Sequence, residues 1–176
     1  MQRVLGRMAL VLSLLAALMG GLTAATATAA TATDSPAYRF LNNATGGSLL
    51  PEGYGNSSAD GIYMYAWDPI YTYGGDQWRF EFASNGYVLI RNTKTGKCLK
   101  PGGPYYGKTY LTQGTCNDAY EFHWRLEQRF SDGLWKITSR SSRQVITPYY
   151  GQGLNEVVVL EPDSNIAKHW WSVDQI

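Results

Sequence analysis

The sequence predicts an all-β protein built from three similar segments, and three observations carry this prediction. The chain of 176 residues contains 13 Tyr, 6 Trp and 19 Gly, residue types that are common in strands and tight turns. After residue 36, no segment repeats apolar residues at helical spacing over three turns. The same series of landmarks also occurs three times along the chain, about 45 residues apart.

The N-terminal segment, residues 1–29, has the features of a secretory signal peptide. Arg3 and Arg7 precede an uninterrupted apolar run at residues 8–19, and small residues follow it. We therefore expect cleavage near Ala30 and a secreted protein. A membrane anchor is disfavoured, because about 20 apolar residues are needed to cross a bilayer.

The remaining chain has the size of one domain. We expect residues 30–36 to form a flexible tail and residues 37–176 to fold together. Removing the two arginines of the signal peptide leaves 13 basic and 14 acidic residues, a net charge close to −1. A nearly neutral chain without a stripe of Lys and Arg offers no electrostatic basis for binding nucleic acid or an anionic membrane. We therefore expect neither a nucleic-acid partner nor membrane insertion.

Each repeat is expected to begin with a strand, pass through a polar turn and continue to a proline. The segment from Arg39 to Pro51 aligns with the segment from Leu89 to Pro101 at a constant offset of 50 residues. An offset of 47 residues brings the third repeat into line as far as Pro148. A Tyr-Gly step and a further strand follow in each repeat. The predicted repeats are residues 37–84, 85–131 and 132–176, and the further strands are residues 62–67, 109–112 and 157–160.

A tryptophan closes each repeat, and we expect these three side chains to point into a shared core. They are Trp78, Trp124 and Trp171. A repeat of this size holds four short strands and cannot bury its own apolar face, whereas three copies packed around an axis can. We therefore interpret these tryptophans as core residues rather than ligand contacts, each contributing a few kcal/mol of stability.

This threefold pattern resembles the ricin-type β-trefoil lectin family over residues 38–176. In the middle repeat, the segment from Thr95 to Leu99 matches the family's T-G-x-C-L motif, and Cys116-Asn117 matches its second cysteine. The resemblance implies a β-trefoil fold with a disulfide between Cys98 and Cys116, and an even pair of cysteines in an exported protein favours the same bond. Such a bridge would stabilise the fold by about 3 kcal/mol.

Two departures from the family bear on function. Members that bind galactose or mannose usually carry an acidic residue directly after Cys-Leu, and the corresponding positions here are Leu50, Lys100 and Thr147. The family's Gln-x-Trp ending also lacks its glutamine, which is replaced by Asp76, Phe122 and His169. The resemblance therefore implies carbohydrate binding without the usual acid that accepts hydrogen bonds from sugar hydroxyls.

Candidate ligand-binding residues lie in the loops between the proline and the closing tryptophan. Proteins usually bind sugars with an aromatic ring against the apolar face and short polar side chains at the hydroxyls. Trp67 matches the stacking position of the family, and Pro-Tyr-Tyr-Gly occurs at residues 104–107 and 148–151, which indicates that two repeats share a surface. The alternative is that these tyrosines are half-buried turn residues. The candidates are Tyr54, Trp67 and Asp68 in the first repeat, Tyr105, Tyr106, Asn117 and Asp118 in the second, and Tyr149, Tyr150 and Asp163 in the third.

No pattern in the sequence indicates catalysis or a bound cofactor. His123 and His169 stand beside tryptophans in different repeats, and we interpret both as structural. The chain has no cluster of Cys and His at zinc spacing, no glycine-rich phosphate loop and no Gly-x-Ser-x-Gly motif. We therefore predict a protein that is not an enzyme and holds no metal and no cofactor.

The prediction for function is a secreted, lectin-like carbohydrate-binding module whose repeats bind glycans weakly and act together. Two alternatives stay open, because a fold does not define a function. Residues 65–80 and 86–99 also resemble the lectin-like A and C subunits of cytolethal distending toxins, which implies a protein-interaction or toxin-delivery role. Residues 63–75 form an insertion long enough to serve as the reactive loop of a trefoil hydrolase inhibitor.

Overall fold

The computed structural model describes residues 36–176, so the expected signal peptide and nearly all of the expected tail lie outside the described residues. The described residues form strands joined by turns and short 3-10 segments, which confirms the predicted all-β class. Each predicted repeat folds into four strands, and we call the folded repeats the first, second and third lobes. The first lobe contains β1 (Tyr38–Asn42), β2 (Ser48–Pro51), β3 (Met64–Trp67) and β4 (Trp78–Phe82). The second contains β5 (Val88–Asn92), β6 (Cys98–Tyr105), β7 (Lys108–Gly114) and β8 (Trp124–Gln128), and the third β9 (Trp135–Ser139), β10 (Val145–Pro148), β11 (Glu156–Glu161) and β12 (Trp171–Gln175).

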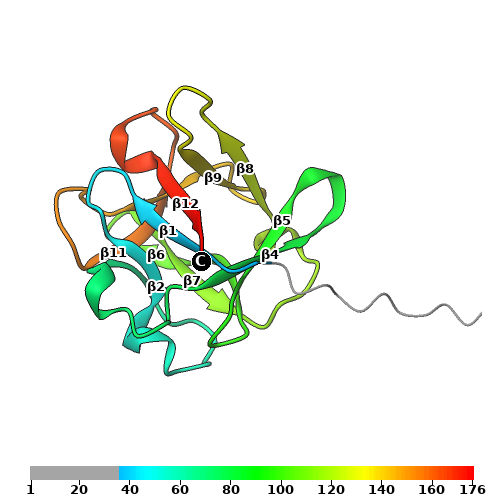
Figure 1. The fold of residues 1–176 in the computed structure, drawn as a ribbon. Coiled ribbons are helices and arrows are strands. Elements are labelled where there is room, and N and C mark those ends of the chain that lie inside the picture. Colours follow the sequence, from blue (N-terminus) through cyan, green and yellow to red (C-terminus); the bar gives the residue numbers. More distant parts are fainter. Residues whose placement is uncertain (1–35) are drawn as a thin grey trace, which may run out of the picture. The chain divides into compact units, whose positions relative to one another are not determined.

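Two outer strands from each lobe close a barrel. β1 pairs with β4, β4 with β5, β5 with β8, β8 with β9, β9 with β12, and β12 with β1. Figure 1 shows β1 and β12, the first and last strands, side by side. The two middle strands of each lobe form a hairpin, and the three hairpins meet because β11 pairs with both β3 and β7. This barrel with its cap of three hairpins is the expected β-trefoil.

Equivalent side chains of the three lobes fill the core. The closing tryptophans Trp78, Trp124 and Trp171 are fully buried, as predicted. Each indole nitrogen donates a hydrogen bond to a backbone carbonyl in the second strand of its own lobe. The acceptors are Leu49, Leu99 and Ile146, at 2.8, 3.1 and 3.1 Å. Because a buried indole N–H needs an acceptor, this repeated bond fixes the position of the tryptophan at the same point in each lobe.

The polar turns after β1 and β5 are each organised by a buried asparagine. The side-chain oxygen of Asn92 accepts hydrogen bonds from the backbone N–H groups of Lys94 and Thr95, and its nitrogen donates to the carbonyl of Gly75 at 2.7 Å. Asn42 accepts the corresponding backbone bonds in the first lobe. The side-chain nitrogen of Asn42 donates to the carbonyl of Lys168 at 2.8 Å, so Asn42 joins its turn to the end of the third lobe as Asn92 joins its turn to the end of the first. These bonds explain why the polar turn recurs in the sequence.

The disulfide between Cys98 and Cys116 is present, with Cα atoms 5.0 Å apart. It joins the start of β6 to the segment after β7, so it links the two ends of the second lobe's hairpin covalently. Within residues 36–176, no helix is long and apolar enough to cross a membrane.

Candidate ligand-binding site

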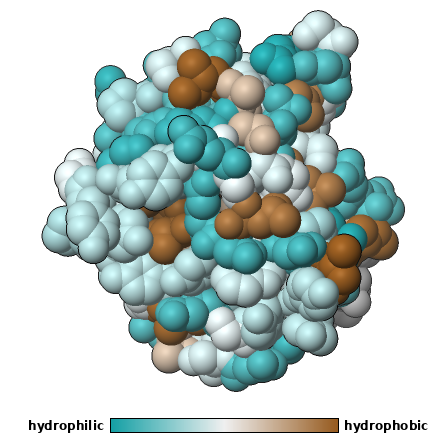
Figure 2. All heavy atoms as spheres, turned by 90° about the vertical axis from the view of Figure 1, so that its left-hand side faces the viewer, coloured by the Kyte–Doolittle hydropathy of each residue, from teal (hydrophilic) through white to brown (hydrophobic). Residues whose placement is uncertain are grey.

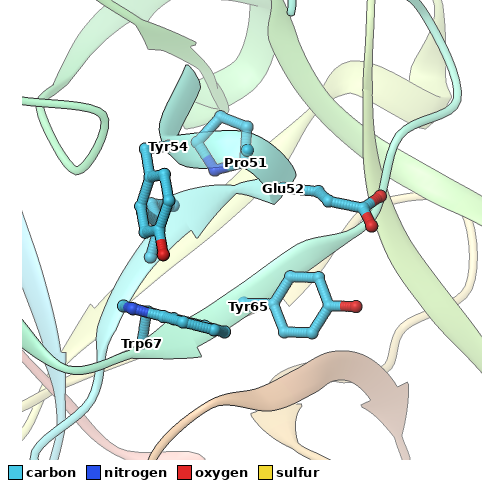
Figure 3. Close-up of a pocket in the computed structure, with 7 residues that line it drawn as sticks. Pro51, Glu52, Tyr54, Tyr65 and Trp67 are labelled. Atoms are coloured by element: carbon cyan, nitrogen blue, oxygen red, sulfur yellow. The ribbon is translucent and has the colours of Figure 1, made fainter. Parts of the chain in front are cut away.

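The first lobe carries a pocket of about 210 Å³ at the end of its hairpin. Its side walls are the rings of Tyr54, Tyr65 and Trp67, with Pro51 and Glu52 at the turn. Figure 3 shows the Tyr54 ring directed toward Trp67, with Tyr65 beside it on the same strand. The Tyr54 and Trp67 rings meet edge to face, with centroids 5.7 Å apart. The pocket is smaller than the roughly 300–1,000 Å³ of sites for drug-sized ligands, so it suits a single ring.

Tyr54 is held over this pocket by an unusual backbone conformation. It lies in the 3-10 segment η1 (Glu52–Gly55) with φ of +60°, a value that residues other than glycine rarely adopt. Two contacts fix it there. Lys94 donates from its Nζ to the Tyr54 carbonyl oxygen at 2.9 Å, and a Cβ on Gly75 would approach that oxygen to 2.5 Å. The ring is therefore positioned before any ligand arrives, which reduces the entropy lost on binding.

Glu52 and Tyr65 add polar groups to the aromatic walls. Burial raises the pKa of Tyr65, and the negative charge of Glu52 raises it further, so the phenol stays neutral and can donate a hydrogen bond. The exposed carboxylate of Glu52 is an acceptor for hydroxyl groups. The first-lobe pocket thus combines an apolar ring surface, a donor and an acceptor.

Asp68, the third candidate of the first lobe, does not line this pocket. Its carboxylate accepts the backbone N–H of Ile70 at 3.0 Å and caps the 3-10 segment η2 (Pro69–Tyr71). Its own backbone N–H donates to the side chain of Asn155 in the third lobe. Asp68 therefore shapes the loop that follows Trp67.

The tyrosines predicted in the second and third repeats come together in one cluster on the hairpin cap. The ring centroids of Tyr105 and Tyr149 are 5.6 Å apart, those of Tyr105 and Tyr106 are 4.9 Å apart, and those of Tyr149 and Tyr150 are 4.6 Å apart. This confirms that the two Pro-Tyr-Tyr-Gly segments share a surface. Tyr63 joins the cluster from the first lobe, 5.9 Å from Tyr105. We call these five residues the tyrosine cluster.

Exposure differs within the tyrosine cluster. Tyr106 is 81% exposed and Tyr150 is 69% exposed, whereas the other three rings are half-buried. Burial raises the pKa of Tyr105, and its tyrosine neighbours raise it further. The alternative interpretation of these residues as half-buried turn tyrosines thus fits Tyr105 and Tyr149, while Tyr106 and Tyr150 present their rings to solvent.

A half-buried carboxylate, that of Glu161, supports the tyrosine cluster through the lysines that it binds. Lys108 places its Nζ 4.5 Å from the centre of the Tyr149 ring and pairs with Glu161 at 2.7 Å. Burial alone would raise the pKa of Glu161, but hydrogen bonds from Lys108, Lys168 and His169 lower it to about 2. The carboxylate is therefore ionised under ordinary conditions and keeps both lysines beneath Tyr149.

The other predicted polar residues lie apart from the aromatic groups. Asn117 lines a separate concavity of about 660 Å³ between the first and second lobes. Asp118 accepts a hydrogen bond from His123 at 2.7 Å, and Asp163 pairs with Lys136. The structure therefore engages both aspartates in local contacts within the protein. Both histidines are fully buried and hydrogen-bonded, which agrees with a structural role.

Sequence reasoning did not identify Glu52 and Tyr65 as site residues. Tyr65 had a usable signal, because residues two apart on a strand share a face and Trp67 was already a candidate. Glu52 had no such signal. It lies beyond the end of a strand, next to residues 53 and 54 with left-handed backbone angles, and the alternation of side chains along a strand does not predict its direction. The surface in Figure 2 carries isolated hydrophobic residues among polar ones, so no broad apolar patch covers that face of the domain.

Comparisons with known proteins agree with the β-trefoil fold. A family model described as ricin-type beta-trefoil lectin domain-like matches residues 74–161. No curated protein matches the sequence. The designed threefold-symmetric protein ThreeFoil is similar in structure with a TM-score of 0.71 and 19% identity, over 80% of this chain and 99% of that one.

Two natural proteins are also similar to this chain in structure. The ricin B-like lectin of Macrolepiota procera, solved in complex with lactose, has a TM-score of 0.63 and 19% identity over 83% of this chain and 100% of its own. A chain of the cytolethal distending toxin of Haemophilus ducreyi has a TM-score of 0.64 and 17% identity over 80% and 83%. At these identities the structural likeness establishes the fold.

Proposed function

Because the chain belongs to the ricin-type β-trefoil lectin-like family, we propose that it is a secreted, non-catalytic carbohydrate-binding module whose main site is the first-lobe pocket. The observation that carries this proposal is the combination of Trp67, Tyr54 and Tyr65 with the carboxylate of Glu52 around one small cavity. A sugar ring needs an apolar wall and hydroxyl partners together, and this cavity supplies both.

In the proposed complex, the apolar face of a sugar ring lies against Trp67. Tyr54 stands edge-on to Trp67 and closes one side of the pocket. The Glu52 carboxylate accepts hydrogen bonds from sugar hydroxyls, taking over the task of the acid that is missing at Leu50. Charge-assisted bonds of this kind are about twice as strong as neutral ones, so Glu52 contributes to selectivity for a hydroxyl pattern.

The tyrosine cluster is the second contact region in this proposal. Its exposed rings, Tyr106 and Tyr150, come from different lobes but share one surface. A chain of several sugars can touch both the first-lobe pocket and this cluster, whereas a free monosaccharide can touch one of them. The proposal therefore implies weak binding of single sugars and stronger binding of longer chains through effective concentration.

A glycan-array screen followed by calorimetry with the best hit tests the proposal. Trp67→Ala should weaken binding at least about tenfold, because it removes the main stacking surface. Glu52→Gln should change the preference among hydroxyl patterns. Phe130→Ala is the matched control, since this aromatic side chain is 94% exposed and lies outside the pocket. Glycan binding that survives combined replacement of Trp67, Tyr106 and Tyr150 by alanine would disprove this assignment of residues.

A protein partner is the second candidate function, and exposed residues beside the first-lobe pocket favour it. Ile70, Tyr71 and Tyr73 are 78%, 52% and 69% exposed, and they lie in the insertion after Trp67. Tyr73 also packs against Tyr54, with centroids 5.2 Å apart. A blank glycan screen from folded protein would favour this candidate over sugar binding.

A further inference from the structure

A further concave site lies between the second and third lobes, and none of the residues considered above for sugar binding lines it. It has a volume of about 350 Å³ and is lined by three arginines, two tyrosine rings, a threonine and a serine. These are Arg125, Arg140, Arg143, Tyr87, Tyr120, Thr138 and Ser139. No carboxylate is among its lining residues. We call this site the arginine pocket.

Arg140 is held rigidly in the arginine pocket. Its guanidinium lies 3.8 Å from the centre of the Tyr120 ring and 4.6 Å from the centre of the Tyr87 ring. Its Nη1 donates to Nδ1 of His123 at 2.8 Å, and Nε2 of the same imidazole bonds Asp118 at 2.7 Å. Two rings and a buried histidine therefore orient this charge, yet no carboxylate among the described residues pairs with it.

Arg143 occupies a position that the backbone reserves for glycine. Its φ is +59°, and the equivalent residues of the other lobes are Gly46 and Gly96, with φ of +69° and +70°. A side chain at such an angle is strained, so arginine here lowers stability relative to glycine. Within residues 36–176 its guanidinium makes no ion pair. Strained residues that serve no packing purpose are found preferentially at functional sites.

The pseudo-threefold repeat supplies two internal comparisons. Between the first and second lobes, Thr93 and Gly96 stand where Arg140 and Arg143 stand, and Arg91 there pairs with Glu81. Between the third and first lobes, the same two places hold Asn43 and Gly46. The β-trefoil fold therefore does not require these two arginines, and they occur together on one of the three equivalent surfaces.

We propose that the arginine pocket binds an oxyanion, a sulfate, phosphate or carboxylate group carried by a larger molecule. Guanidinium groups bind such groups through paired N–H donors. Arg125 is partly neutralised by Glu127 at 3.1 Å, so Arg140 and Arg143 supply the net charge, with the Thr138 hydroxyl as a further donor. The volume leaves room for a ring that bears the group. This site is separate from the first-lobe pocket and stands whether or not that pocket binds sugars.

A titration of the purified protein at constant low ionic strength, monitored by NMR of the arginine side chains, tests the proposal. The probes are sodium sulfate, sodium phosphate, glucuronate and a sulfated polysaccharide, with sodium chloride as the reference salt. We expect saturable binding of at least one probe, with shifts in the Nε–Hε signals of Arg140 and Arg143. Binding of inorganic sulfate or phosphate identifies a free ion as sufficient. Binding of glucuronate or the polysaccharide alone identifies a group that must be carried on a sugar.

Two variants decide the residues. Arg143→Gly restores the residue of the other two lobes, so the domain should fold with an equal or higher Tm while the affinity falls about tenfold, the loss expected for a charge-assisted hydrogen bond. Arg129→Gln is the matched control, because Arg129 also stacks on an aromatic ring, 4.2 Å from that of Trp170, but is already paired with Asp132. The proposal is overturned by an absence of saturable binding for every probe. It is equally overturned if Arg143→Gly binds as the original protein does, or if Arg129→Gln loses as much affinity.

Discussion

Replacing Glu156 by glutamine tests how the third-lobe loop is held around Tyr150, one of the two exposed tyrosines of the cluster. One carboxylate oxygen accepts the backbone N–H groups of Tyr150 and Gly151, both at 2.7 Å. The other accepts those of Gln152 and Gly153, at 3.0 and 2.9 Å. In glutamine, one of these oxygens becomes an NH2 group that cannot accept a hydrogen bond. Two of the four hydrogen bonds are therefore lost, and the new NH2 group then lies against two backbone N–H groups that are also donors.

The magnitude follows from these two bonds. A hydrogen bond to a charged group contributes roughly 1.5–3 kcal/mol to stability, but this loop is open to solvent and water replaces part of the loss. We expect Glu156→Gln to lower the free energy of unfolding by about 2 kcal/mol, measured by urea denaturation followed by tryptophan fluorescence at pH 7. Glu121→Gln is the control, because it removes only the surface ion pair with Lys100, and should change stability by less than about 1 kcal/mol. Equal stability of Glu156→Gln and the original protein would refute the reasoning.

The same carboxylate predicts a pH dependence. Burial would raise the pKa of Glu156, but the four backbone N–H groups lower it below its ordinary value of 4.5. A lowered pKa in the folded state means that the ionised form stabilises the fold above the unfolded pKa, and that this stability is lost as the pH falls through the folded value. The difference in stability between the original protein and Glu156→Gln should therefore shrink on acidification below about pH 4.5.

Two further predictions concern the fold. Trp124→Ala should lower the free energy of unfolding by about 3–5 kcal/mol, because a fully buried ring and its bond to the Leu99 carbonyl are both lost; guanidinium denaturation measures this, and a loss below about 1 kcal/mol would contradict a core role. Replacing Cys98 and Cys116 together by serine should cost about 3 kcal/mol, seen as a lower Tm in calorimetry, and an unchanged Tm would show that the bridge does not constrain the unfolded chain.

The repeat in the sequence predicted the fold because the same local chemistry is required three times. A buried asparagine organises the turn after the first strand of a lobe at Asn42 and again at Asn92, 50 residues later. Ser139 at the third position departs from this residue type, yet its hydroxyl still accepts the backbone N–H of Ser142 at 3.4 Å. Such short-range requirements leave a periodic trace in a single sequence.

The candidate site was predicted only in part. Trp67 and Tyr54 lie in the same lobe and meet across one hairpin, so sequence position was a fair guide to their proximity. Asp68, Asp118 and Asp163 were chosen for residue type, and the structure engages each of them in a local contact. Whether a polar side chain serves a turn or faces solvent depends on backbone angles and neighbours that no spacing rule supplies.

By itself, the sequence determined the all-β class, the threefold repeat and the buried tryptophans, because each depends on residue type at regular spacing. The family resemblance and the even pair of cysteines implied the disulfide. Only the tertiary structure decided which surface residues meet. Tyr63 joins the tyrosine cluster because its backbone pairs with the second lobe's hairpin across the cap, and Arg140 stacks on Tyr87 and Tyr120 because two lobes pack along the barrel. Contacts between lobes are set by how whole strands pair, and that pairing leaves no local pattern in the chain.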